Sequence, residues 1–160
     1  MDADALDRSR RVLGEDHPDT LISANGLAAD LRGLGEYEQA RRMDEDTLTR
    51  LRRILGEDHT NTLISANGLA ADLRRLGEYE QARQLDADTL DRRRRVLGEN
   101  HPDTLSSANG LAADLRRLGE YEQAGQLDED TRRRKRVLPP DNGREREPRR
   151  PAGQAAADQL

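Results

Sequence analysis

The sequence contains no cysteine, phenylalanine or tryptophan, and three tyrosines are its only aromatic residues. Without cysteine it can form no disulfide, thiolate metal site or cysteine nucleophile. Lysine occurs once, as Lys135 in the stretch RRRKRV, so the glycine–lysine pair of a phosphate-binding loop is missing too. No apolar run reaches the roughly 20 residues of a membrane-spanning helix, and the N-terminus does not resemble a secretory signal. We therefore expect a cytoplasmic protein that neither hydrolyses ATP nor associates with a membrane.

Charge divides the chain into two parts. Hydrophobic residues make up 33% and charged residues 37% of the sequence, which predicts a thin core. Residues 1–130 carry 18 basic and 28 acidic side chains (net −10), and residues 131–160 carry 9 and 4 (net +5), which together give the formal −5. The stretch 139–160 is rich in Pro, Arg, Gly and Ala without periodicity, and this composition predicts a disordered basic tail.

An internal repeat organises everything before this tail. The segment 13–54 recurs at 55–96 with 33 of 42 positions identical, and it recurs again at 97–138. Residues 1–13 align with 43–55, so the chain opens with a partial repeat that holds only the second half of the unit. A fixed period of this length is typical of a solenoid. The predicted organisation is a partial repeat (1–13), three repeats (13–54, 55–96 and 97–138) and the tail (139–160).

Each repeat predicts two helices. In the first repeat, Pro18 stands at a helix start and apolar residues follow at helical spacing until Gly35. A second helical pattern begins at Tyr37 and ends at Gly56, with acidic residues crowded near its beginning and arginines at its end, as the helix dipole favours. A lone hairpin of this size cannot bury both faces, so neighbours must stack. The expected fold is an all-α solenoid of stacked antiparallel helical hairpins.

These repeats resemble the tetratricopeptide signature, and the turn LGEDHPDTL resembles the kinesin-light-chain variety in its bacterial form. The resemblance rests on these recurring residues: Leu27, Ala28, Gly35, Tyr37 and Ala40; Leu69, Ala70, Gly77, Tyr79 and Ala82; Leu111, Ala112, Gly119, Tyr121 and Ala124. It implies a right-handed superhelix whose first helices line a concave groove that grips peptides or partner domains. We expect neither catalysis nor a cofactor. Asp44 departs from the family, which often has Tyr or His there.

Carried over from the family, the groove-lining positions include the apolar Ile22 and Ile64 and two polar columns. The predicted site residues are Asn25, Arg32, Asn67, Arg74, Arg75, Asn109, Arg116 and Arg117. An amide both donates and accepts, so the Asn column can hold an extended peptide backbone, and Arg suits carboxylates, which indicates an acidic protein or peptide partner. Two alternatives stay open: the Asn column caps or spaces helices, and Arg32, Arg74 and Arg116 pair with nearby aspartates.

Other residue types have plain structural interpretations. His17, His59 and His101 recur in one turn, a whole hairpin apart, so we expect turn residues rather than ligands of a metal. The carboxylates recur in register with the repeat and indicate solvated helix faces rather than a catalytic pair. Gly26, Gly68 and Gly110 lie inside a helix, where close approach of a neighbouring helix is favoured over contact with a ligand. The tyrosines are assigned to hairpin packing.

The predicted function is that of a protein–protein interaction scaffold and not of an enzyme. The first alternative is a nucleic-acid-associated protein that uses the basic tail. The basic stretch Arg132 to Arg136 is interpreted as charge at a helix end, because no aromatic residues for base stacking are interleaved with it. The second alternative is that the chain is the sensor-array part of a larger nucleotide-binding switch protein.

Overall fold

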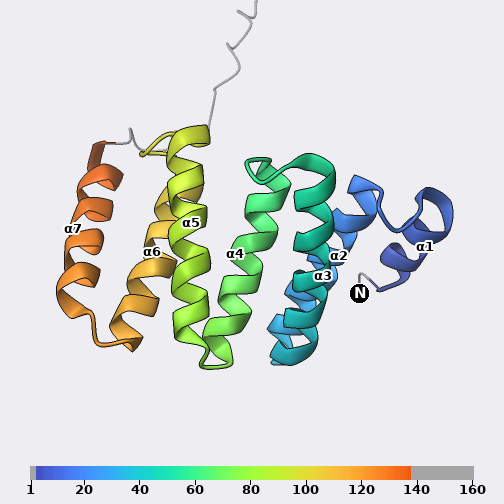
Figure 1. Cartoon of the computed structure of the whole chain (residues 1–160), viewed down its shortest axis with the longest axis horizontal. Helices are drawn as coiled ribbons and strands as arrows, with labels where there is room; N and C mark the ends of the chain where they lie inside the picture. The colour runs from blue at the N-terminus through green and yellow to red at the C-terminus, as the bar shows by residue number, and fades with distance from the viewer. Residues whose placement is uncertain (1–2, 138–160) are drawn as a thin grey trace, which may run out of the picture.

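The structure is a computed structural model that describes residues 3–137, which form seven α-helices and no strand. The helices are α1 (Ala3–Leu13), α2 (Pro18–Gly33), α3 (Tyr37–Leu55), α4 (Thr60–Arg75), α5 (Tyr79–Leu97), α6 (Pro102–Arg117) and α7 (Tyr121–Val137). They stand side by side in chain order, so that α1 and α7 mark opposite ends of one row (Figure 1). This confirms the predicted all-α solenoid. The tail predicted at 139–160 lies outside the described residues.

Local signals set the helix boundaries. The three histidines are N-caps of α2, α4 and α6, and the Nδ1 atom of His59 accepts a hydrogen bond from the backbone N–H of Asn61 at 3.1 Å. Their predicted role as turn residues is therefore confirmed. A glycine with positive φ follows each of the helices α1 to α6, such as Gly56 at 88°, a conformation that residues with a Cβ adopt only under strain.

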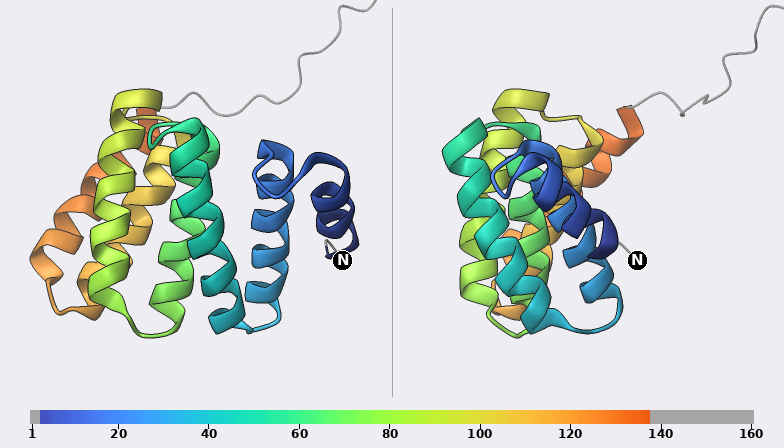
Figure 2. Two further views of the ribbon diagram at one scale, coloured as in Figure 1. Left: turned by 45° about the vertical axis from the view of Figure 1, so that its right-hand side comes forward. Right: turned by 90° about the vertical axis from the view of Figure 1, so that its right-hand side faces the viewer.

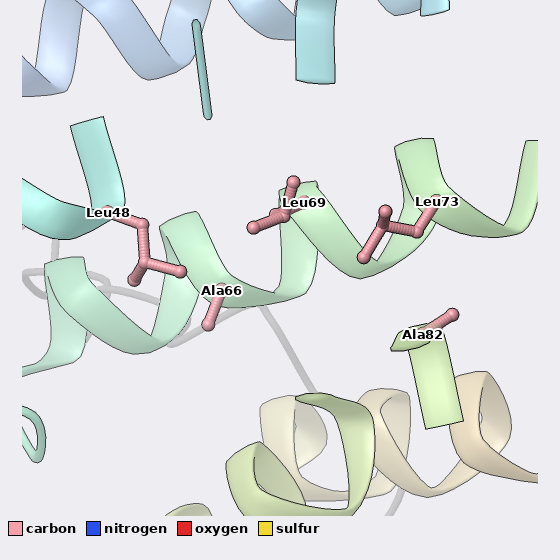
Figure 3. Close-up of a cluster of buried hydrophobic side chains, with 5 residues drawn as sticks. All are labelled: Leu48, Ala66, Leu69, Leu73 and Ala82. Carbon is pink, nitrogen blue, oxygen red and sulfur yellow. The ribbon is translucent and has the colours of Figure 1, made fainter. Parts of the chain in front are cut away.

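The core is a narrow seam of leucine and alanine between neighbouring hairpins. Leu48 of α3, Ala66, Leu69 and Leu73 of α4, and Ala82 of α5 form its central cluster (Figure 3). Leu48 is 2% exposed and Ala82 is fully buried. Because these residues come from three helices and two repeats, each hairpin depends on the next for its burial.

The first helices of the repeats form the inner side of the row. Helix α2 contacts α4, and α4 contacts α6, whereas within residues 3–137 α3 does not contact α5 and α5 does not contact α7. Helices that lie closer together occupy the inside of a curved array. Seen along the row, successive hairpins do not eclipse one another, so the array also twists (Figure 2, right).

Candidate protein-interaction face

The inner helices present one stripe of solvent-accessible residues each. On α4 the stripe contains Ile64, Asn67, Ala71 and Arg75, which follow one another at intervals of three or four residues. Ile22 and Ile64 are exposed by 45% and 46%, although both are bulky and apolar. We call the matching stripes of α2, α4 and α6 the inner face. Apolar side chains on such a surface are available to a partner.

The asparagines predicted for the groove lie on this inner face. Asn25 and Asn67 are half-buried, and Asn109 is exposed. The side-chain oxygen of Asn25 is buried and accepts no hydrogen bond from any described residue. A buried carbonyl oxygen without a donor is unfavourable.

Arg32 and Arg74 lie in the joints between repeats rather than free on the inner face. The guanidinium of Arg32 donates to Asp72 of the next repeat at 2.5 Å (Nε–Oδ1) and to Asp44 of its own repeat at 2.7 Å (Nη2–Oδ2). Arg74 donates in the same way to Asp114 and, at 2.5 Å, to Asp86. Pairing with aspartates, the alternative that the sequence left open, is what both residues do.

These two joint triads, Arg32–Asp44–Asp72 and Arg74–Asp86–Asp114, explain the glycines inside the inner helices. A Cβ added to Gly68 would lie 2.8 Å from Oδ2 of Asp44, and one added to Gly110 would lie 2.7 Å from Oδ2 of Asp86. The carbonyl oxygen of Gly68 also accepts a hydrogen bond from Arg32 at 3.2 Å. Close approach of a neighbouring element is therefore confirmed, and the approaching group is a carboxylate.

Arg75 and Arg117 remain on the surface. Their guanidinium groups lie over the rings of Tyr37 and Tyr79 of the preceding repeat, 5.9 Å and 5.8 Å from the ring centroids, which is within cation–π range. Both tyrosines are half-buried, as hairpin packing requires. The same prediction for Tyr121 is wrong: its side chain is 70% exposed, because among the described residues no following repeat covers it.

Arg116 holds only half of a joint triad. Among residues 3–137 it pairs with a single carboxylate, that of Asp128 at 2.9 Å. The side chains of this pair are 46% and 26% exposed, compared with 24% and 1% for Arg74 and Asp86. Arg116 is therefore an accessible cation, whereas Arg32 and Arg74 are largely occupied.

Each joint triad places two carboxyl groups around one guanidinium. Burial raises the pKa of Asp44 to about 8, and the neighbouring carboxyl of Asp72 contributes, while Arg32 offsets only part of the shift. Burial likewise raises the pKa of Asp86 to about 8, opposed by Arg74 and, more weakly, by Arg93. The Oδ1 atom of Asp86 accepts no hydrogen bond from a described residue. Both observations fit a protonated carboxyl at Asp86 near neutral pH.

We expect the array to become less stable as the pH rises from 6 to 9. The folded chain retains protons on Asp44 and Asp86 up to about pH 8, whereas the unfolded chain releases them at about pH 4. The folded state thus binds more protons between these values, so its stability is fully present below the lower one and falls through the upper one. Urea denaturation followed by circular dichroism at a series of pH values measures this. The double variant Asp44→Asn, Asp86→Asn mimics the protonated form, and an equal pH dependence in it would contradict the assignment.

The repeats can be compared with known protein families. The sequence profile of the tetratricopeptide repeat family matches residues 1–53, 23–92 and 61–136. The chain belongs to the tetratricopeptide repeat family. No curated protein matches it in sequence.

Several solved structures share the fold of this tetratricopeptide repeat chain. A single-substitution variant of a kinesin light chain from Podosopora anserina with nearly identical TPR-like repeats is 24% identical with a TM-score of 0.70, over 81% of this chain and 61% of its own. BtubC (BKLC) from P. vanneervenii is 20% identical with a TM-score of 0.76, over 99% of this chain and 62% of its own. The TPR domain of Arabidopsis FLU is 24% identical with a TM-score of 0.66, over 74% of this chain and 96% of its own.

These similarities establish the kinesin-light-chain-like tetratricopeptide fold. The chain spans about three fifths of the length of the first two structures. Among the described helices, none combines the length and the apolar character that crossing a membrane requires.

Proposed function

We propose that this chain is a protein–protein interaction scaffold, and that its inner face binds an extended segment of a partner. Tetratricopeptide repeats generally mediate interactions between proteins, and the repeated order of groups on the inner face supports this role here. Ile64, Asn67 and Arg75 lie along α4 in this order, and α6 repeats the amide and the cation as Asn109 and Arg117. The observation that carries the proposal is this solvent-accessible column of apolar, amide and cationic groups.

The proposed ligand is an acidic peptide in a cytoplasmic partner. Arg75 and Arg117 supply accessible cations on the inner face, whereas Arg32 and Arg74 are engaged by aspartates. The carboxylates of the ligand would therefore bind to Arg75 and Arg117 rather than to Arg32 and Arg74. Net negative charge over residues 1–130 repels acidic ligands at long range, but salt screens distant charges beyond about 8 Å at physiological strength, and contacts at the docked ligand persist.

A random-peptide library tests this proposal without a known partner. The library is selected on the full chain after depletion on a variant whose inner face is altered by Ile64→Asp, Asn67→Asp and Arg75→Glu. We expect enrichment of peptides that carry carboxylates and bind the unaltered chain only. Failure to enrich any peptide that distinguishes the two proteins, with both folded by circular dichroism, would contradict binding at the inner face.

With an enriched peptide in hand, Asn67→Ala should weaken binding by about 1 to 3 kcal/mol, because the peptide backbone then leaves a polar group unmatched. The unfolding free energy should change by less than about 0.5 kcal/mol, since Asn67 is on the surface stripe. Isothermal titration calorimetry gives the affinity. Gln81→Ala on α5 is the matched control, as it removes an exposed amide away from the inner face. Equal effects of the two changes would count against a role for the Asn column.

A further inference from the structure

The last described hairpin, α6–α7, ends in a surface that repeats the joint between repeats but lacks its second half. We call it the end face and define it by Arg116, Tyr121, Asp128, Arg132 and Lys135. At the two complete joints, the following inner helix brings an aspartate to the arginine and an arginine to the tyrosine ring. At the end face, Arg116 meets one carboxylate and Tyr121 is 70% exposed within the described part of the chain.

The complete joints also show what kind of helix fits. On α4, Gly68 leaves room for the carboxylate of Asp44, Asp72 bonds Arg32, and Arg75 covers Tyr37. On α6, Gly110, Asp114 and Arg117 do the same. The fitting helix therefore has the pattern Gly-x-x-x-Asp-x-x-Arg in its C-terminal half.

The other half of the end face differs from the internal joints in charge. Leu48 and Leu90 are 2% exposed at the two joints, and the position equivalent to them on α7 is Arg132, which is exposed. Three residues further along, the same repeat position holds Leu51, Arg93 and Lys135 in the three repeats. Leu51 is buried, Arg93 donates a hydrogen bond to Ser107 at 2.8 Å, and Lys135 is exposed. A helix that docks here must place carboxylates opposite Arg132 and Lys135. At these two positions the inner helix α6 has Ala108 and Ser107.

We propose that the end face receives an acidic helix from a partner protein, with carboxylates opposite Arg132 and Lys135, followed by an aspartate for Arg116 and an arginine for Tyr121. Continuity with the two internal joints and charge complementarity support this occupant. This surface is separate from the inner face, so the proposal does not depend on peptide binding there.

A second copy of this chain fits the end face less well. The inner helix that another copy would offer is α2, whose residues at the two facing positions are Ser23 and Ala24. Neither is a carboxylate, and Ala24 is already buried, with Leu6 of α1, which is 1% exposed, in the joint that precedes it. The second copy would have to lose α1 and would still leave Arg132 and Lys135 unmatched.

Synthetic peptides derived from α6 test the proposal against the full chain. One peptide has the sequence of residues 99–120, and the other carries Ser107→Glu and Ala108→Glu, the positions that would face Lys135 and Arg132. Isolated helices of this length are marginal in water, so binding is measured by NMR titration at low ionic strength. We expect the acidic peptide to bind about tenfold more tightly than the unaltered one, on the scale of two exposed ion pairs.

Charge reversal on the chain distinguishes specific docking from general attraction. Arg132→Glu with Lys135→Glu should reverse the preference in favour of a peptide with Lys at the same two positions. Arg42→Glu with Arg95→Glu makes the same change in net charge at exposed sites on α3 and α5 and should leave the preference intact. Arg116→Ala should weaken binding of every peptide that retains Asp114.

Four results would overturn the proposal. The absence of binding by either peptide would leave the end face as a solvated cap of the array, and equal binding of the two peptides would remove the case for an acidic helix. Binding only after removal of residues 138–160 would make the chain's own segment the occupant. Self-association that is abolished by the Arg132→Glu, Lys135→Glu change would make it a second copy.

Discussion

Replacing Arg74 with alanine is expected to lower the free energy of unfolding by about 3 to 5 kcal/mol, the scale for removing one partner of a buried ion pair. The change leaves Asp86 and Asp114, 1% and 0% exposed at their side chains, with no guanidinium between them. Because protonation of Asp86 relieves the repulsion between the two carboxyls, the loss should be larger at pH 8 than at pH 6. Reversible urea denaturation followed by far-UV circular dichroism measures both values.

Arg116→Ala is the matched control for this change. Arg116 occupies the equivalent position in the last repeat, but its pair with Asp128 is half-exposed. Exposed ion pairs contribute about 0 to 1 kcal/mol, so the loss should stay within that range. Similar losses in the two variants would show that the joint triads contribute no more than surface pairs.

Leu48→Arg is expected to destabilise the chain by about 4 kcal/mol or more. Leu48 is 2% exposed and packs in the central cluster with Ala66 and Leu69, where a guanidinium would be buried among apolar side chains (Figure 3). The change combines the loss of a buried leucine, about 2 to 5 kcal/mol, with the cost of burying a charge. Denaturant melts should show a lower midpoint, or two transitions if the repeats on either side uncouple.

The reverse change at the equivalent position should have almost no effect. Arg132 is exposed at the end face, so Arg132→Leu should alter the unfolding free energy by no more than about 0.5 kcal/mol. If Leu48→Arg were tolerated as well as Arg132→Leu, the apolar seam would not be what couples the repeats.

The solenoid could be predicted from the sequence because its signals are local and repeated. Pro18 and Gly35 mark the ends of a helix through the missing N–H of one and the positive φ of the other, 82° at Gly35. The period then multiplies each signal by three, and stacking follows because one hairpin cannot bury both faces. The exposed positions of Ile64 and Asn67 follow from the same helical spacing.

The contacts of the Arg74 side chain could not be predicted in the same way. Helical spacing places Arg74 at the edge between the inner face and the joint, and a long side chain at an edge can turn toward either. The partner that decides this, Asp114, is 40 residues away in sequence. One signal was available in the sequence: Asp72 lies three residues after Leu69 and four before Leu76, and therefore on the same helix face. A carboxylate on an apolar face indicates a cation opposite.

The joint triads have a consequence for how such a chain can change its length. Excision of residues 44–85 removes one 42-residue period and brings Arg32 to Asp86 and Asp114, with Arg117 above Tyr37. The new junction would contain the same ion pairs, the same glycine and the same cation–π contact as the junctions it replaces. Unequal recombination between neighbouring copies in the coding DNA would therefore produce shorter or longer arrays without creating a mismatched interface. Selection could act on the reach of the array while leaving its internal chemistry unchanged.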